Sequence, residues 1–470
     1  MRSKKFTSLL IKDIHTLVTM DREDTVIRGG FLYAEDGEIR QIGGRPARPP
    51  WRVRASPDRI GASRTLSARH LLAVPGLINT HHHLCQTLTR AVPAAANAEL
   101  FDWLKTLYPI WARLDEEAMY LAAMVGMAEL MLSGCTTSSD HHYLFPRGQT
   151  YLMDAEIEAA RKIGLRFHPC RGSMSVSQKD GGLPPDSVVE DEPAILADSE
   201  RVISRYHDPR PGAMLRIGLA PCSPFSVSKQ LMRETAELAR RQRVRLHTHL
   251  AETKSEEAHC QERFGQRPLE FLDEAGWVAD TTWLAHGIHF NAGEVERLGR
   301  ARVGIAHCPT SNMRLGSGIA PVKALRRRGC PVGLGVDGSA SNDSSEMLAE
   351  ARQALLLARV AGGATALTVK EALRLATVEG AACLGREDLG SLEVGKRADV
   401  ALFDLSELGY SGAGDPLLAL LLCAPARVHT LVIEGRVVVE GGELRTIDVA
   451  PYLRRHRRAA AKLLGGPPLL

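Results

Sequence analysis

The sequence predicts an α/β protein: a (β/α)8 TIM-type barrel of eight parallel strands, with a small β-sandwich built from both chain termini. Apolar strand-like runs alternate with helix-length segments through the middle of the 470-residue chain. Polar side chains follow nearly every one of these runs, and both ends of the chain are rich in short strands. A closed barrel is favoured over an open doubly wound sheet because it brings all the strand ends to one mouth.

The two ends of the chain share one pattern. Residues 1–72 and 389–450 alternate in the manner of short strands, with Asp36-Gly37 and Glu434-Gly435 at positions typical of hairpin turns. Neither piece is large enough to bury a core alone, so one sandwich made from both is expected rather than two separate appendages. Residues 451–470 predict a basic C-terminal helix, which we interpret as a solvated face docked on its own domain rather than a membrane or nucleic-acid element.

Residues 73–388 form the predicted barrel. Helices are expected at 116–132, which is rich in apolar residues, and at 154–163. Eight strands are expected, and they lie within 74–84, 134–140, 165–172, 214–225, 244–252, 281–290, 303–312 and 332–339.

The bulk composition limits the possible partners. A formal net charge of +4 is small for this length, so no nucleic-acid partner is indicated. The apolar run near the N-terminus is broken by Lys12 and Asp13, and no run is long enough to cross a bilayer, so no membrane partner is expected. Nine scattered cysteines without a CxxC pair indicate reduced thiols in a cytoplasmic protein.

The stretch 74–84, VPGLINTHHHL, is typical of a buried strand that delivers imidazoles at its far end. Alternate residues of a strand share a face, so His81 and His83 point the same way and His82 points away. Two converging imidazoles form half of a site for a divalent metal. A histidine cluster without a metal is the alternative for this motif taken alone.

Two later strand ends complete this candidate metal site. The run HTHLAE places His249 nearest the mouth, with His247 inside the barrel, although two packed core histidines are the alternative. Asp337 follows an apolar run, where a carboxylate is costly unless it is paired or bound to metal; a structural ion pair is the alternative. The predicted ligands are therefore His81, His83, His249 and Asp337, a set that favours Zn²⁺ and also suits Fe²⁺.

These residues predict hydrolysis of a carbon–nitrogen bond. A bound metal would lower the pKa of its water and supply hydroxide, and the departing or ring nitrogen must then receive a proton. Glu252 lies at the same mouth to shuttle that proton, and His286 is placed to hydrogen-bond the hydroxide or to relay its proton. Barrels that hold two metals usually bridge them with a lysine after the fourth strand. That strand ends APCSPF here, so one divalent metal per subunit is predicted.

Substrate-binding candidates are less constrained. Gln86 offers amide donors and a carbonyl to a purine or triazine edge, although it is also suited to a helix start. Trp103 is suited to stack on a flat ring, although a buried aromatic is the alternative. Arg171 is suited to bind a carbonyl oxygen of the substrate, although a structural salt bridge is the alternative. The long loop 173–187 is typical either of a lid or of a passive surface loop.

The motifs together resemble the amidohydrolase superfamily, in its branch of mononuclear metal-dependent deaminases. The resemblance covers most of the chain and rests on PGLINTHHH, HTHLAE, AHGIHF, AHCPTSNMRLGSGIAPV, GLGVDGSASND and SLEVGKRADVALFDL. Within that branch TRAVPAAANAELFDWL, SGCTTSSDH, RGSMSVSQKDGGLPPDSVVE and APCSPFSVS are most similar to the bacterial 8-oxoguanine deaminases. The resemblance implies hydrolysis of an oxidised purine, 8-oxoguanine, to urate and ammonia. It also implies a homo-oligomer, the four metal ligands and the proton shuttle given above, and that His286 and Asp337 together handle the proton of the water.

Three alternatives remain open from the sequence. The same metal site would serve an aminohydrolase of hydroxylated s-triazines, similar to hydroxyatrazine ethylaminohydrolase, or a deaminase of guanine or isoguanine. A non-catalytic assembly protein on the same barrel is the remote alternative, because such relatives commonly lose metal ligands and this chain keeps all of the candidates.

Overall fold

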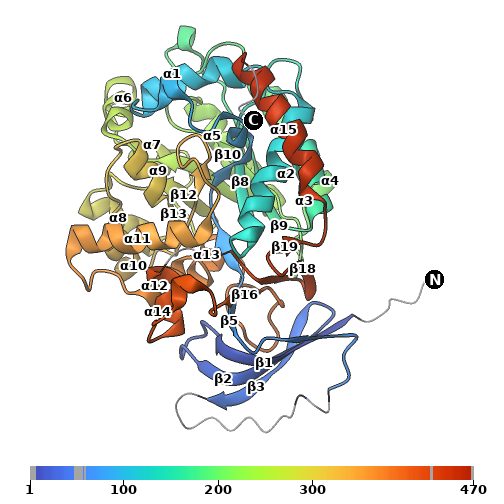
Figure 1. The fold of residues 1–470 in the computed structure, drawn as a ribbon. Helices are drawn as coiled ribbons and strands as arrows, with labels where there is room; N and C mark the ends of the chain where they lie inside the picture. Colours follow the sequence, from blue (N-terminus) through green and yellow to red (C-terminus); the bar gives the residue numbers. More distant parts are fainter. Residues whose placement is uncertain (1–6, 47–56, 58–59, 424–426, 467–470) are drawn as a thin grey trace.

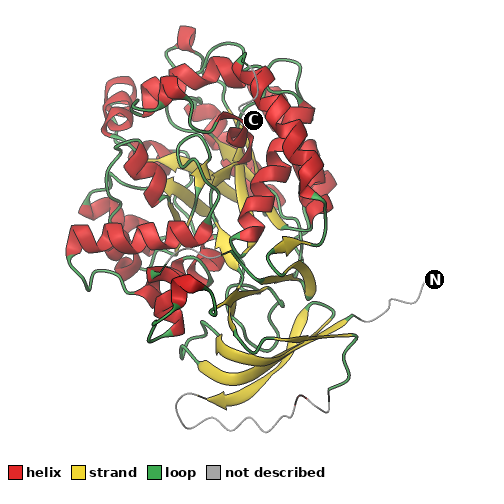
Figure 2. Cartoon of the chain, in the orientation of Figure 1, coloured by secondary structure: helices red, strands yellow, loops and turns green. Residues whose placement is uncertain are grey.

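A closed barrel of eight parallel strands forms the centre of the computed structural model, and the strands from the two chain termini lie at one end of it (Figures 1 and 2). The structure describes residues 7–46, 57, 60–423 and 427–466. In barrel order the strands are β10 (Gly218–Pro221), β11 (Arg245–Leu250), β12 (Thr282–His286), β13 (Gly304–His307), β14 (Val332–Leu334), β6 (Leu77–Asn79), β8 (Cys135–His142) and β9 (Arg166–Ser173). The predicted fold class is therefore confirmed.

Strands from both termini build one mixed sheet of nine strands. Its order is β19 (Glu443–Leu444), β18 (Arg436–Glu440), β17 (Thr430–Ile433), β16 (Val400–Asp404), β5 (Leu71–Pro75), β1 (Ser8–Val18), β2 (Val26–Glu35) and β3 (Glu38–Pro46), with β4 (Arg64–Ser67) paired to β1. Asp36 and Glu434 adopt positive φ in the turns that join β2 to β3 and β17 to β18, as the hairpin prediction requires.

Helices surround the barrel and cover its sides (Figure 2). They are α1 (Leu100–Trp111), α2 (Glu116–Leu132), α3 (Leu152–Ile163), α4 (Glu192–Tyr206), α5 (Lys229–Gln242), α6 (Lys254–Phe264), α7 (Pro268–Glu274), α8 (Ala292–Arg300), α9 (Pro309–Arg314), α10 (Val322–Arg328), α11 (Met347–Gly362), α12 (Val369–Leu375), α13 (Val378–Cys383), α14 (Pro416–Leu422) and α15 (Val449–Leu464). The predicted helix at 116–132 matches α2, whose apolar residues are buried almost all round.

The run 74–84 is divided between the two parts of the fold. β5 belongs to the terminal sheet, and the chain enters the barrel at β6. Gly76 joins the two strands, and a Cβ there would lie 2.2 Å from the Thr136 side chain, so only glycine fits this crossing. The terminal sheet therefore lies at the amino ends of the barrel strands, and the mouth lies at the opposite end.

The basic C-terminal helix α15 packs along α2, as predicted for a docked helix (Figure 1). His456 is buried on its inner face and contacts Thr87 at 3.1 Å between Nε2 and Oγ1, and Arg455 pairs with Glu117 of α2. Among the residues that the structure describes, no helix is both long and apolar enough to span a membrane.

Candidate metal centre and active site

Three imidazoles converge at the carboxyl ends of the barrel strands. His81 follows β6, His83 lies in β7 (His82–His83), and His249 lies near the end of β11. The Nε2 atoms of His83 and His249 are 3.1 Å apart, and one ring nitrogen from each of the three residues lies within 4.8 Å of the others. His82 points away and contacts Ser345 at 2.9 Å, so the alternation predicted for the three histidines is observed.

The second ring nitrogen of each imidazole fixes its tautomer. His83 Nδ1 donates to the carbonyl oxygen of His141 at 2.7 Å, and His249 Nδ1 donates to that of Cys222 at 2.7 Å. His247 Nδ1 donates to the Trp283 carbonyl oxygen, which leaves its Nε2 to accept from His81 Nδ1 at 2.7 Å. All three Nε2 atoms therefore present bare lone pairs to one another, an arrangement that is unfavourable unless a cation lies between them.

Asp337 adds a carboxylate to the three imidazoles. It lies in β15 (Asp337–Gly338), which pairs in parallel with β7, and its Oδ1 is 3.4 Å from Nε2 of both His81 and His83. Asp337 has a φ of 62°, and Oδ1 also accepts from the Gly338 N–H at 2.7 Å. This bent backbone turns the carboxylate toward the imidazoles, and among the described residues no lysine or arginine pairs with it.

The donor set fits a divalent cation such as Zn²⁺. Burial lowers the pKa of His81 and His249 well below its ordinary value, so both rings are neutral at pH 7, as metal ligands must be. His81 Nε2 is fully buried and has no hydrogen-bond partner among the described residues. Three neutral imidazoles with one carboxylate are a common zinc set, so we describe this as a His-rich buried metal site.

Two further ionisable groups lie beside this site, and their surroundings raise the pKa of both. Burial raises the pKa of Glu252 to about 7, and His286 Nε2 lies 3.5 Å from its Oε2. Burial opposes the charged form of His286, but the neighbouring Glu252 and Asp337 carboxylates raise its pKa overall. His286 Nδ1 contacts Asn312 Oδ1 at 2.9 Å, which orients the ring. A carboxyl group poised near neutral pH is suited to accept and return a proton.

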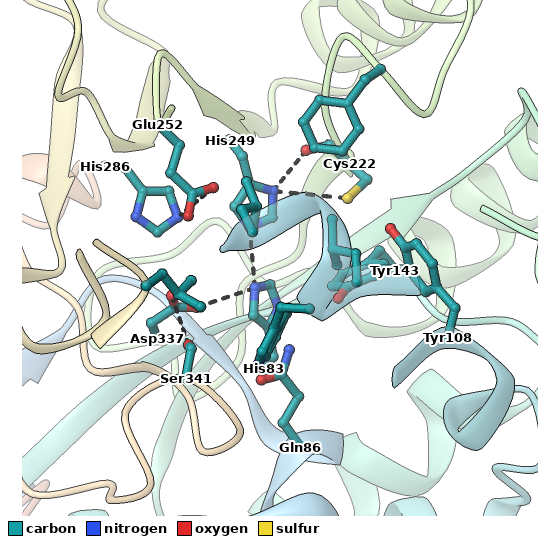
Figure 3. A pocket seen from close by; sticks show the side chains of 15 residues that line it. His83, Gln86, Tyr108, Tyr143, Cys222, His249, Glu252, His286, Asp337 and Ser341 are labelled. Carbon is teal, nitrogen blue, oxygen red and sulfur yellow. Dashed lines mark hydrogen bonds and ion pairs between the residues drawn. The ribbon is translucent and has the colours of Figure 1, made fainter. Parts of the chain in front are cut away.

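A pocket opens over these groups (Figure 3). Gln86 and Trp103 line it: Gln86 Oε1 accepts from the Ala340 N–H at 3.3 Å, and Trp103 Nε1 donates to the Ala340 carbonyl oxygen at 3.3 Å. Both side chains are buried, and the Trp103 ring also packs edge-to-face against Trp111. The other lining residues are His83, Leu100, Leu104, Tyr108, Tyr143, Cys222, Phe225, His249, Glu252, His286, Leu315, Asp337 and Ser341.

Arg171 is not among the residues that line this pocket. Its guanidinium pairs with Glu190 at 2.7 Å and with Asp198 at 2.8 Å, and it lies over the Phe145 ring. The structural salt bridge, which the sequence left as the alternative, is therefore what the structure contains, and substrate contact by Arg171 is not supported. The reason is that the two carboxylates belong to segments whose proximity the sequence does not reveal.

Sequence reasoning missed several residues of the site. β8 continues two residues beyond Asp140, so His141 lies inside the barrel, and its carbonyl oxygen orients His83. Tyr108 and Tyr143 line the pocket, and the hydroxyl of Tyr108 has no hydrogen-bond partner among the described residues. The run DHHYLFP, which places two histidines and a tyrosine at the end of β8, was the one signal of His141 and Tyr143.

Comparisons with known proteins agree with this geometry. The profile of the amidohydrolase family matches residues 72–438. An 8-oxoguanine deaminase from Pseudomonas aeruginosa is 52% identical over 440 residues, 93% of this chain and 95% of its own length. The chain belongs to the amidohydrolase family. It is a metal-dependent aminohydrolase of the class that acts on cyclic amidines.

Other members of the amidohydrolase family extend the comparison. A hydroxydechloroatrazine ethylaminohydrolase from Pseudomonas sp. strain ADP is 38% identical over 475 residues, which cover 99% of this chain and 97% of the relative. The crystal structure of an atrazine chlorohydrolase from Arthrobacter aurescens, complexed with zinc, has a TM-score of 0.91 and 32% identity, and the match covers 96% and 100% of the two chains. An adenosine deaminase from Xanthomonas campestris with bound zinc has a TM-score of 0.87, 28% identity and 98% and 99% coverage.

Proposed function

We propose that this amidohydrolase deaminates an oxidised purine, converting 8-oxoguanine to urate and ammonia. The observation that carries the proposal is the set of bare Nε2 atoms of His81, His83 and His249 beside Glu252, a carboxyl group with a pKa of about 7, at the base of a pocket. The 52% identity to an 8-oxoguanine deaminase across nearly the whole chain supports this substrate.

One cation would be held by the three imidazoles and Asp337. Zn²⁺ is the metal we propose, with Fe²⁺ also suited to the set, because related structures were solved with zinc. When bound, such a cation supplies Lewis-acid activation of a water molecule. The end of β10 offers Pro221 and Cys222 where a bridging lysine would be needed, which supports one cation rather than a bridged pair.

The protein groups would move the proton of that water. Glu252 would accept a proton from the water and return it to the ring nitrogen or the departing amine, while His286 and Asp337 would hydrogen-bond the water and take up its second proton. Gln86 would bind the purine edge, and Trp103 would pack on the ring. We also propose that the chain works as a homo-oligomer, as members of the family commonly do.

A substrate comparison tests the proposal. Zinc-loaded protein would be given 8-oxoguanine, guanine, isoguanine and a hydroxylated N-ethylamino-s-triazine, and ammonia or ethylamine release would be measured. The triazine is included because of the 38% identity to hydroxydechloroatrazine ethylaminohydrolase. We expect kcat/KM for 8-oxoguanine to exceed that for the triazine by about 10²-fold or more, since a site built for one hydrogen-bonding edge rejects another. Preferential turnover of the triazine would overturn the purine assignment.

A further inference from the structure

A second cluster of ligand-type side chains lies behind the barrel wall. Asp140 and His142 are alternate residues of β8, so they share the face that points away from the barrel interior, and Glu156 of α3 meets them there. One ligand atom from each of the three residues lies within 4.8 Å of the others. His141, between the two strand residues, faces the barrel interior instead and stacks on His249.

Most polar atoms of this cluster contact nothing outside it. The carboxyl groups of Asp140 and Glu156 contact each other. Within the described part of the chain, no other group hydrogen-bonds to Glu156 or to Oδ2 of Asp140, and both ring nitrogens of His142 are without a partner. All three residues are at most 1% exposed. Leaving so many buried polar atoms unsatisfied would destabilise the fold. Such a group of orphaned atoms indicates a component that the side chains themselves do not supply.

The two acids of the cluster repel each other when both are ionised, and a cation between them removes that repulsion. Two carboxyl groups face each other here, and burial raises the pKa of both Asp140 and Glu156 well above its ordinary value. Burial lowers the pKa of His142 to about 3, so its ring is neutral and offers only a lone pair to a ligand. Arg171 is the neighbouring cation, but Glu190 and Asp198 already pair with it.

We propose that Asp140, His142 and Glu156 form a second metal site, which binds a zinc-type divalent cation behind the barrel wall. Two carboxylates and one neutral imidazole are a ligand set that Zn²⁺ takes with water in the remaining position, and a divalent cation neutralises both carboxylates. The site is separate from the mouth, so the argument against a bridged pair there does not apply to it. The total would then be one cation at the mouth and one behind β8.

This second site is linked to the first through the backbone. Asp140 Oδ1 accepts from the Leu84 N–H at 2.6 Å, and Leu84 directly follows His83. Leu84 also begins η2 (Leu84–Thr89), the short helix that carries Gln86 of the pocket. A cation that fixes Asp140 would therefore hold the start of η2 in place. The inference of a second metal site stands without the proposed substrate, because it rests on residues outside the pocket.

Metal counting tests the second site directly. Wild-type protein, the variant E156Q and the mouth variant H249N would be dialysed against buffered Zn²⁺ alone, and bound zinc would be measured by mass spectrometry of metals. We expect about two zinc ions per subunit in the wild type and about one in each single variant, because each substitution removes a ligand of one site only. A double variant is expected to bind none.

The control keeps charge loss separate from ligand loss. E350Q also neutralises a buried glutamate, but Glu350 is held by Thr310 and Asn342 and is not in the cluster, so it should keep both zinc ions. If E156Q does not fold, crystals of zinc-loaded wild type provide the test: an anomalous peak among the three residues supports the site. A wild type that binds one zinc ion, with no such peak, would show that the carboxyl groups share protons instead and would overturn the proposal.

Discussion

The imidazoles of the mouth differ from ordinary buried histidines in what their Nδ1 atoms contact. These Nδ1 atoms donate hydrogen bonds to the carbonyl oxygens of His141 and Cys222 and to the ring of His247. Each Nε2 lone pair is therefore left for a common ligand. At this scale the chemistry is decided by hydrogen bonds to the far side of each ring. Glu252 differs from the other residues of the mouth because it is a carboxyl group whose pKa burial raises to about 7.

Replacing Glu252 by glutamine tests its proposed role as a proton shuttle. E252Q keeps the size of the side chain and removes its ability to accept a proton, so we expect kcat to fall by at least about 10²-fold. Zinc content should equal that of the wild type, since Glu252 is not among the proposed ligands. Loss of zinc in E252Q would instead indicate that Glu252 is a ligand of the metal.

The pH dependence of the rate follows from the same carboxyl group. Glu252 must be ionised to accept a proton from water, and its raised pKa means that the ionised fraction falls as the pH drops through about 7. We therefore expect kcat/KM to decrease on acidification. The midpoint of this acidic limb of the pH–rate profile should lie at or somewhat below pH 7, because a cation at the mouth favours the ionised form of Glu252. Rate profiles on wild-type protein of constant zinc content would reveal this limb, and a rate that rises on acidification would contradict the assignment.

At the scale of elements, the strand ends and the short segments after them determine which residues of the site come into contact. β15 pairs with β7, and their register places Asp337 opposite His82 and Gly338 opposite His83. The same approach leaves no room at Gly338, where a Cβ would lie 1.9 Å from Oε1 of Gln86. The position of the Gln86 amide in the pocket therefore depends on a glycine of another strand.

Substituting Gly338 by alanine should displace the Gln86 amide from the pocket. The contact is with the far end of a flexible side chain, so the protein should fold and keep its zinc. We expect KM to rise several-fold with a smaller change in kcat, because substrate contact is lost rather than proton transfer. G293A, at an exposed position of α8 with its nearest atom 3.4 Å away, is the matched control and should leave both constants unchanged. An unchanged KM in G338A would argue against Gln86 as a substrate contact.

On the scale of the whole molecule, the terminal sheet and the barrel are joined by buried charges. Arg166 begins β9 and is fully buried, and its guanidinium pairs with Asp399 at 3.0 Å and Glu434 at 2.5 Å beside the terminal sheet. It also donates to the carbonyl oxygens of Gly212 and Ala213. This network lies at the end of the barrel away from the mouth, so it serves stability rather than chemistry.

Removing the arginine from this network should destabilise the fold. In R166M a buried carboxylate at Asp399 loses its main partner, and we expect the free energy of unfolding to fall by about 3–5 kcal/mol. Denaturant or thermal unfolding would measure this loss. R300A breaks an exposed pair with Glu296 and should change stability by less than about 1 kcal/mol. Equal effects of the two substitutions would show that the Arg166 network contributes little.

The sequence by itself determined the barrel and most of the candidate metal site. Eight alternations of strand and helix predict a parallel barrel, and in such a barrel the strand ends meet whatever the details of packing. The proximity of residues at strand ends, such as His81, His83, His249 and Asp337, could therefore be predicted from the sequence. The domain boundaries and the role of the loop 173–187 remain predictions.

The tertiary structure alone decided which side chains those residues contact. From the sequence, Arg171 was equally suited to bind substrate or to form a salt bridge. In the structure it pairs with Glu190 and Asp198, because the folding of distant segments brings their carboxylates beside its guanidinium. The Nδ1 partners of the imidazoles and the cluster of Asp140, His142 and Glu156 were likewise invisible in the sequence. The physical reason is that a periodic pattern specifies the face a side chain occupies, whereas its neighbour on that face comes from a distant segment whose position only packing determines.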